Sequence, residues 1–208
     1  GEGTVLEHTL RAVDASERTD EIILVTREDL LVPLAELCKG CALQKPVKVI
    51  RGGETRTESV MAGALEADPR AELIAVHDGA RPLITPELFD AVVESAGVTG
   101  ASAPAVPVTD TIKVADENGI VRSTPERRTL FAVQTPQVFH TSLLMKAYRQ
   151  PYRRQFTDDA SVVEWAGGRV YLCEGEYSNI KITTPIDRIT AEALLDLGSA
   201  GDRRKVVE

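Results

Sequence analysis

Short apolar runs alternate with longer amphipathic segments along most of the chain. The apolar runs lie at residues 21–26, 47–50, 73–76 and 100–106. The segments between them repeat their apolar positions with helical spacing, at residues 29–40, 57–65 and 86–95. Strands that are apolar on both faces and separated by amphipathic helices are typical of a parallel sheet covered on both sides. We therefore predict an α/β fold with a mostly parallel sheet and helices on both faces.

Residues 107–138 interrupt this alternation. Two strand-like pieces, 111–114 and 120–122, flank the sequence Asp116-Glu117-Asn118-Gly119, in which Asn-Gly is a strong signal for a hairpin turn. A second β pair is expected near residues 130–134. The pattern predicts a projecting β-arm over residues 107–134, and such arms often serve dimer contacts.

The remaining residues return to the alternating pattern. Helices are expected at 141–148, 160–166 and 185–197, and strands at 169–173 and 180–182. The chain has no internal repeat and no low-complexity linker. We therefore treat residues 1–208 as a single domain that carries the arm.

Composition and charge narrow the possible partners. No apolar run approaches the ~20 residues that cross a bilayer, and no basic segment followed by an apolar one marks a signal peptide. We therefore expect a cytoplasmic protein without a membrane partner. The net charge of −8 argues against a nucleic-acid partner. Local Arg and Lys side chains can still bind a small anion. Cys38 and Cys41 form a lone C-x-x-C with no second cysteine pair and no His cluster near it, so we expect structural thiols.

Polar residues that directly follow strands are the first candidates for a site, because ligands of open α/β sheets bind at the carboxyl ends of the strands. Gly52-Gly53-Glu54-Thr55-Arg56 follows the second strand and leads to Ser59 in the next helix. The glycines allow close backbone approach, and a helix N-terminus with a hydroxyl suits an anion or a polar base. An ordinary strand-to-helix turn is the alternative.

His77-Asp78-Gly79-Ala80-Arg81-Pro82 follows the third strand. Asp78 could bind a metal or a hydroxyl, and Arg81 a phosphate or a carboxylate. The two could instead pair with each other and close the turn, and the residues alone leave both readings open. His77 is expected to be structural, because nothing nearby supplies a nucleophile for it to activate.

Thr, Lys and Arg residues on the arm and beyond it suit a phosphate. They lie in Asp110-Thr111-Ile112-Lys113, Arg127-Arg128 and Thr135-Pro136-Gln137. For Lys113 and Arg128 a solvated hairpin face is the expected role.

Two further polar positions lie nearer the C-terminus. Thr157 or Asp158 could simply cap the following helix. Lys181 is expected within a strand, pointing opposite to Ile180 and Ile182, where it would protect an edge or contact a ligand. We favour the ligand.

Six motifs together are far more specific than any one of them. They are G-G-E-T-R-x-x-S-V-x-x-G, V-H-D-G-A-R-P, V-x-D-T-I-K, Q-T-P-Q-V-F, T-D-D-A-S and N-I-K-I-T-T-P-x-D. In this order, between about Val5 and Leu197, they resemble the methylerythritol-phosphate cytidylyltransferase family. The resemblance implies a Rossmann-like nucleotidyltransferase fold and a homodimer that exchanges contacts through the β-arm. It also implies Mg²⁺-assisted transfer of a cytidylyl group from CTP to 2-C-methyl-D-erythritol 4-phosphate, a step of non-mevalonate isoprenoid biosynthesis.

The resemblance also implies a role for each matching residue. The nucleotide would be bound by Gly52, Gly53, Glu54, Ser59, Asp78 and Gly79, with Asp78 also at the metal. Lys181 would be the catalytic cation at the α-phosphate. Methylerythritol phosphate would be contacted by Asp78 and Arg81 and by Thr111 and Arg127 of the partner's arm, and Thr135 and Thr157 would border the site. Glu54 stands where the family sometimes has Asp.

One part of the family pattern is expected ahead of this sequence. The family begins with a strand, a loop of the type A-A-G-x-G-x-R and a Lys, whereas Gly1-Glu2-Gly3-Thr4 matches the segment that follows them. A chain without that loop is expected to bind CTP poorly. Two alternatives stay open: a ribitol-5-phosphate cytidylyltransferase, which Ala80 disfavours slightly, and a non-catalytic dimeric nucleotide-binding protein.

Overall fold

The computed structural model describes residues 3–150 and 156–199. Gly1 and Glu2, which belong to the segment compared with the glycine-rich loop, lie outside the described residues. In chain order the helices and strands are α1 (Val5–Asp14), β1 (Ile22–Thr26), η1 (Glu28–Leu30), α2 (Leu31–Gly40), β2 (Val47–Arg51), α3 (Arg56–Glu66), β3 (Leu73–Val76), α4 (Pro86–Thr99), β4 (Ala101–Pro107), β5 (Val114–Ala115), β6 (Val121–Ser123), η2 (Arg127–Thr129), β7 (Phe131–Val133), β8 (Gln137–His140), α5 (Thr141–Tyr148), α6 (Asp159–Trp165), β9 (Tyr171–Glu174) and α7 (Pro185–Ser199).

The main sheet is mixed. Its strands follow the order β3-β8-β4-β7, with β9 paired to β4. Because β8 runs antiparallel to both β3 and β4, those two strands share one direction, and β9 is parallel to β4. β1 and β2 form a separate parallel pair. The predicted Rossmann-like α/β fold is confirmed, and β8, which was not predicted, lies between two strands that point the same way.

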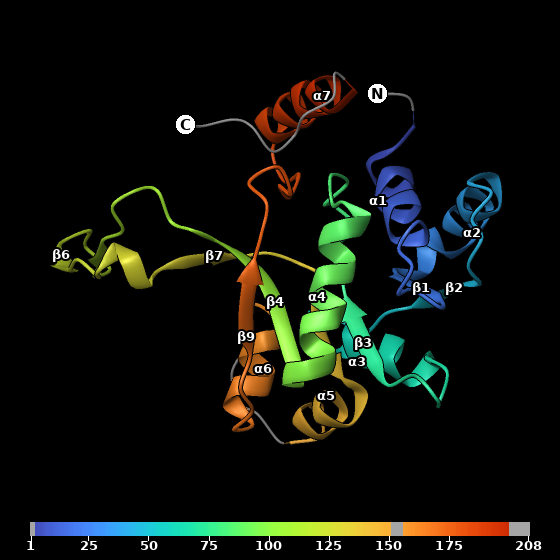
Figure 1. The fold of residues 1–208 in the computed structure, drawn as a ribbon, viewed down its shortest axis with the longest axis horizontal. Helices are drawn as coiled ribbons and strands as arrows, with labels where there is room; N and C mark the ends of the chain where they lie inside the picture. The colour runs from blue at the N-terminus through green and yellow to red at the C-terminus, as the bar shows by residue number, and fades with distance from the viewer. Residues whose placement is uncertain (1–2, 151–155, 200–208) are drawn as a thin grey trace.

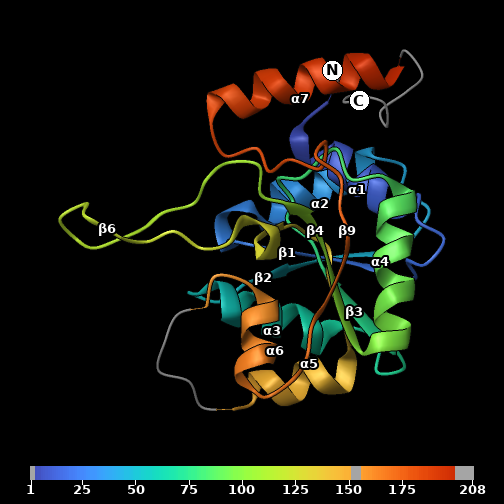
Figure 2. The same cartoon turned by 60° about the vertical axis from the view of Figure 1, so that its left-hand side comes forward.

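Helices cover both faces of this sheet, as the apolar pattern predicted. Phe139 of β8 packs with α5 and α6 on one face, and its neighbour Val138 packs with α4 on the other. Figure 2 shows α4 on one side of the sheet and α5 and α6 on the other. A third cluster joins α1 and α2 to the β1-β2 pair. Successive side chains of a strand point to opposite faces, so β8 contributes to both cores.

The two sheets are separated by a cavity. β1 pairs only with β2 and β3 only with β8 among the described residues, so neither strand is hydrogen-bonded to the other. A cavity of about 1100 Å³ lies between them, lined by all residues of both strands and by parts of α1, α3 and α4. Both strands therefore present an unpaired edge to the same apolar space.

The arm projects from the body, as Figure 1 shows at the left of the molecule. β5 and β6 pair antiparallel around Asn118-Gly119, and Gly119 adopts a φ of 79°, which confirms the hairpin signal. A strand is present near residues 130–134, as expected, but it does not form a second pair within the arm. This strand, β7, pairs with β4 of the main sheet. The base of the arm is therefore continuous with the body.

Two other predictions were incomplete. Residues 5–14 form α1, and the signal was present, because Thr4 and Glu7 make a capping box at its start. Residues 180–182 form no strand, and the reason lies in the site described below. No helix of the described ranges is both long and apolar enough to span a membrane.

Candidate functional site

Asp78 lies just after β3 and receives two cations on one oxygen. Arg81 Nε lies 3.3 Å from Asp78 Oδ2, and Lys181 Nζ lies 3.1 Å from the same atom. Burial raises the pKa of this carboxyl group, but Lys181 and Arg81 outweigh that effect, so the pKa lies below its ordinary value. The Asp78–Arg81 ion pair raised by the sequence is therefore present, and Lys181 joins it from a distant segment.

The segment that carries Lys181 is held by turns, which is why the strand prediction for 180–182 was wrong. Ile182 donates its backbone N–H to Ala80 O (2.8 Å), and the Asn179 side chain donates to Thr135 O (3.0 Å). Arg81 Nη1 donates to Asn179 O (2.6 Å). These bonds run to the segments after β3 and before β8 and replace a strand ladder. Lys181 remains 46% exposed and can reach a ligand.

His77 and Thr135 hold the backbone of the Asp78 turn. Asp78 N–H donates to Thr135 Oγ1 (3.0 Å), and Thr135 Oγ1 lies 3.0 Å from His77 Nδ1. The other ring nitrogen of His77 lies 3.4 Å from Arg81 O. With its oxygen already accepting, the Thr135 hydroxyl can donate to Nδ1, which leaves Nε2 protonated toward the carbonyl. Burial lowers the pKa of His77 to about 4. The structural role expected for His77 agrees with these contacts.

The Gly52–Ser59 segment forms a tight strand-to-helix turn. Thr55 caps α3 and makes a capping box with Glu58. A Cβ on Gly53 would lie 2.2 Å from the Glu58 Cβ, and one on Gly52 would lie 2.6 Å from Ser59 Oγ. Both glycines are therefore required by close packing. Glu54 is exposed, and its N–H donates to Glu58 Oε2 (2.8 Å).

The start of α3 and the turn after β3 meet at one cavity, whereas Gly52, Gly53 and Glu54 are not among its lining residues. Ser59 of α3 lines the cavity between the sheets together with Asp78 and Gly79, and Arg56 joins them. The structure thus brings residues predicted for the nucleotide next to the Asp78–Lys181 cluster, as expected for the carboxyl ends of neighbouring strands.

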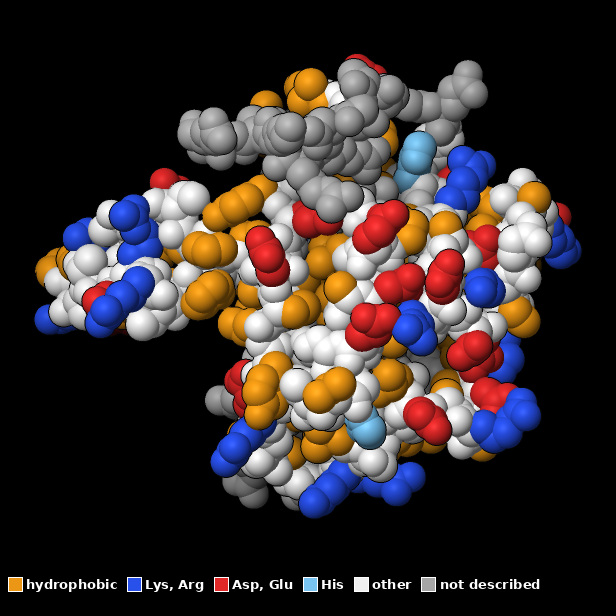
Figure 3. Space-filling view, in the orientation of Figure 1, with side chains coloured by type: hydrophobic (Ala, Val, Ile, Leu, Met, Phe, Trp, Pro, Cys, Tyr) orange, Lys and Arg blue, Asp and Glu red, His pale blue; other side chains and the backbone are white. Residues whose placement is uncertain are grey.

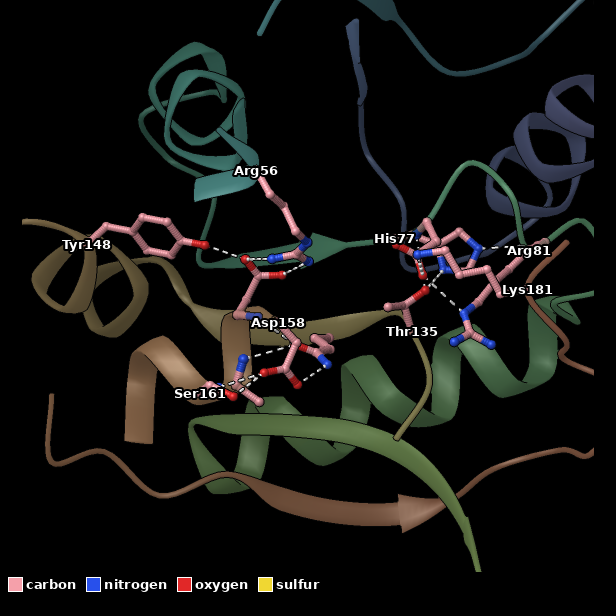
Figure 4. A network of polar contacts seen from close by, with 12 residues as sticks. Arg56, His77, Arg81, Thr135, Tyr148, Asp158, Ser161 and Lys181 are labelled. Carbon is pink, nitrogen blue, oxygen red and sulfur yellow. Dashed lines mark hydrogen bonds and ion pairs between the residues drawn. The ribbon is translucent and has the colours of Figure 1, made fainter. Parts of the chain in front are cut away.

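Arg56 belongs to a polar network that was not predicted from the sequence. It makes two hydrogen bonds to Asp159, whose side chain is fully buried, and the Tyr148 hydroxyl donates to the same carboxylate. Figure 4 shows this network beside the His77–Lys181 cluster. The only sequence signal is a Tyr, an Asp and an Arg far apart in the chain, which no local pattern connects.

The predicted arm residues do not join this cluster within one chain. Thr111 and Arg127 are exposed on the arm, and Arg127 Nη1 donates to Thr109 O (2.8 Å). Thr157 is exposed just ahead of α6, whose N-cap is Asp158, so the capping alternative holds for Asp158. The structure of a single chain therefore contains the body part of the predicted acceptor site.

Asp78 is compatible with a Mg²⁺ ion that arrives with a phosphate ligand. Among the described residues, no group of three or more His, Cys, Asp or Glu side chains could hold a metal ion. Mg²⁺ is commonly bound by one or two carboxylates together with substrate phosphates and water. Both cations contact Oδ2, so the second oxygen of Asp78 suits such a shared ion.

Comparisons with known proteins agree on one family. The family model described as 2-C-methyl-D-erythritol 4-phosphate cytidylyltransferase matches residues 1–197. A protein of that name from Caldanaerobacter subterraneus is 44% identical over 198 residues, covering 92% of this chain and 86% of the relative. One from Bacillus licheniformis is 43% identical, covering 92% and 83%. The crystal structure of 4-diphosphocytidyl-2C-methyl-D-erythritol synthase from Anaerococcus prevotii has a TM-score of 0.87 and 34% identity, covering 94% of this chain and 87% of that one.

The first prediction concerns His77 and acid stability. Unfolded histidine binds a proton near pH 6.5, whereas folded His77 stays neutral to about pH 4. The free energy of unfolding should therefore be highest above pH 6.5 and fall by about 3 kcal/mol toward pH 4 because of this group. Urea unfolding across this range should show a shallower decline for His77→Gln than for the wild type. An equal decline in the free energy of unfolding for both proteins would contradict the lowered pKa of His77.

Proposed function

The chain belongs to the 2-C-methyl-D-erythritol 4-phosphate cytidylyltransferase family, and on this premise we propose that it transfers the cytidylyl group of CTP to 2-C-methyl-D-erythritol 4-phosphate. The products are CDP-methylerythritol and pyrophosphate, and the step belongs to non-mevalonate isoprenoid biosynthesis. The observation that carries the proposal is the meeting of Lys181 and Asp78 next to the cavity that Ser59 lines. The ribitol-phosphate and non-catalytic alternatives gain no support from the structure.

The reaction needs alignment and charge neutralisation more than proton transfer. A phosphate oxygen of the acceptor attacks the α-phosphorus of CTP in line and forms the new P–O bond. The bond from the α-phosphorus to the bridging oxygen breaks, and pyrophosphate leaves with its electron pair. The acceptor oxygen is already an anion, so no general base is required. His77 has both ring nitrogens directed at Thr135 and Arg81, which agrees with a mechanism that does not use it as a base.

Lys181 is the proposed catalytic residue. Its ammonium group lies beside Asp78 and is half-exposed, so it can contact an α-phosphoryl oxygen while Asp78 keeps it oriented. A cation aimed where charge develops lowers the barrier without moving in the reaction. Mg²⁺ bound at Asp78 with the triphosphate would supply further neutralisation of phosphate charge. Arg81, 12% exposed and anchored to Asn179 O, would present its guanidinium to the acceptor.

The resemblance implies a strand and a loop ahead of Gly1, and we propose that this strand occupies the cavity between β1 and β3. An inner strand of a parallel sheet needs apolar neighbours and a hydrogen-bonding edge on each side, and the cavity offers both. We propose that the glycine-rich loop after this strand brings backbone amides and cations to the triphosphate. A protein that includes the segment should bind CTP more tightly than residues 1–208 alone.

The exposed apolar residues of the arm support a homodimer. They lie along both of its strands and at its base: Ile112, Val114, Ile120, Val121, Phe131 and Val133. Figure 3 shows hydrophobic side chains where the arm leaves the body and Lys and Arg side chains farther out. A monomer seldom exposes such a row of apolar side chains. We propose a two-fold dimer in which Thr111 and Arg127 of one chain complete the acceptor site of the other, with Thr135 and Thr157 at its border. The cytoplasmic location expected from the sequence remains a prediction.

The second prediction tests Lys181. Lys181→Ala should lower kcat about a hundredfold or more and change the KM of either substrate much less, because the lost charge acts mainly in the transition state. Pyrophosphate release from CTP is the measurement. Lys48→Ala is the matched control, since Lys48 is similarly exposed and lies on β2 away from Asp78. Near-normal turnover of Lys181→Ala would show that Lys181 is not catalytic and only forms an ion pair with Asp78.

The third prediction concerns the base. The Gly52-Gly53-Glu54 turn and Ser59 should read cytosine through hydrogen bonds, so kcat/KM with CTP should exceed that with UTP, ATP or GTP by about a hundredfold or more. Gly53→Ala, which places a Cβ against Glu58, should weaken CTP binding. Comparable turnover with a purine triphosphate would overturn both the site and the proposed function.

The fourth prediction concerns the shared site. Arg127→Ala should raise the KM of the acceptor and leave CTP binding nearly unchanged, because its guanidinium would pair with the acceptor phosphate. Mixing inactive Arg127→Ala and Lys181→Ala chains should restore up to about a quarter of wild-type activity, since each mixed two-fold dimer holds one intact site. No recovery despite proven subunit exchange would place Arg127 outside the partner's site.

A further inference from the structure

The proposed site is divided between two parts of the molecule. Gly52 to Ser59 belong to the connection from β2 into α3, next to the β1-β2 pair. Asp78, Arg81 and Lys181 belong to the segments around the main sheet. The two sheets share no hydrogen bond among the described residues, and the cavity lies between them. The distance between the two halves of the site therefore depends on contacts that bridge the sheets.

One such contact lies directly at the site. Arg56 is the first residue of α3, and its Nη1 and Nη2 donate to Asp159 Oδ1 (2.9 Å) and Oδ2 (2.5 Å). This two-pronged geometry fixes direction as well as distance, which a single ammonium group cannot do. Figure 4 shows Arg56 reaching from α3 toward the start of α6.

The Asp159 end of this contact is rigidly held. Its side chain is fully buried and also accepts from the Tyr148 hydroxyl of α5. The backbone N–H groups of Asp159 and Ala160 donate to Gln137 Oε1 at 3.1 and 2.9 Å. Gln137 is the first residue of β8 in the main sheet. Arg56 is thus tied, through one carboxylate, to the sheet that carries the acceptor half of the site.

Other contacts also bridge the halves. Thr9 of α1 donates to Gly79 O at 2.9 Å, next to Asp78. Val60 and Met61 of α3 pack against the core beneath α5 and α6. Arg18 pairs with Glu94 of α4 at 2.6 Å, but both side chains are more than half exposed. Ser16 donates to Asp90 of the same helix. Both precede β1, at the amino end of the strand, whereas Arg56 follows β2 at the end where the site lies. Exposed ion pairs such as Arg18–Glu94 restrain little, whereas the Arg56–Asp159 pair has one fully buried partner and holds the first residue of α3 directly.

We propose that Arg56 is a positioning residue for the nucleotide half of the site. Clamped by Asp159, it sets the start of α3, and with it the Gly52-Gly53 turn and Ser59, at a fixed distance from Asp78 and Lys181. It acts through the turn and does not contact the substrates. This inference rests on the proposed function for its kinetic consequence, but its structural consequence can be measured without any nucleotide.

The kinetic test compares three variants of a protein that includes the segment ahead of Gly1. Arg56→Ala should raise the KM for CTP at least tenfold and lower kcat about tenfold, while the acceptor KM stays within twofold. Arg56→Lys keeps the charge without the two-pronged geometry, so it should fall between the alanine variant and the wild type. Arg18→Ala, which removes the solvated pair, should match the wild type.

A second control separates positioning from stability. Tyr148→Phe removes a hydrogen bond to the same Asp159 carboxylate but leaves α3 attached to α6. It should lower Tm while the KM for CTP stays unchanged. If Arg56→Ala behaves in the same way at a temperature well below its Tm, with CTP KM and kcat within twofold of the wild type, Arg56 is structural only and the proposal is wrong.

Hydrogen exchange without nucleotide gives the independent measurement. The Glu58 and Ser59 N–H groups are bonded within the cap to Thr55. Their exchange should be at least tenfold faster in Arg56→Ala and unchanged in Arg18→Ala. Should a wild-type protein that includes the segment ahead of Gly1 fail to bind CTP, the proposed function fails, and the exchange result alone then tests the role of Arg56. Equal exchange in wild type and Arg56→Ala would overturn it.

Discussion

The double contact of Lys181 and Arg81 with one oxygen of Asp78 is the interaction on which the proposed site depends. A partly buried carboxylate with a lowered pKa is stable only because two cations reach it, and they come from segments far apart in the chain. The surrounding hydrogen bonds hold Asp78 and the Lys181 segment in position. Thr135 and His77 fix the Asp78 backbone, and Asn179 ties the Lys181 segment to Arg81 and Thr135.

This arrangement agrees with the proposed group transfer, which requires neither a nucleophile nor a general base from the protein. The proposed reaction requires the acceptor phosphate to be held in line with the α-phosphate of CTP, and it requires cations where negative charge develops. Lys181 and Arg81 are held by backbone turns at the carboxyl ends of strands, where open α/β sheets bind ligands. The half of the site proposed for the nucleotide is anchored separately, through Arg56 and the buried Asp159. Removing Arg56 would leave the fully buried Asp159 carboxylate without its cation.

The arm is the part of the chain that we propose reaches the site of a second chain. Its hairpin is held to the main sheet through β7, so its direction is fixed by the body. Its Thr111 and Arg127 lie away from the Asp78 cluster of their own chain, and its apolar side chains are exposed. An acceptor site completed by a neighbour would account for both features and would couple activity to assembly.

Periodicity and turn chemistry, which are local, determined the α/β class, most helices and strands, the hairpin at Asn118-Gly119 and the tight turn at Gly52-Gly53. The order of the motifs determined the family and the candidate residues around Asp78 and Ser59. Tertiary structure alone decided that Lys181 lies in a turn, because its segment bonds to Ala80 and Thr135, which no pattern within residues 180–182 reveals. Tertiary structure also placed β8 between β3 and β4 and paired Arg56 with Asp159, because strand order and this ion pair join residues that are remote in sequence.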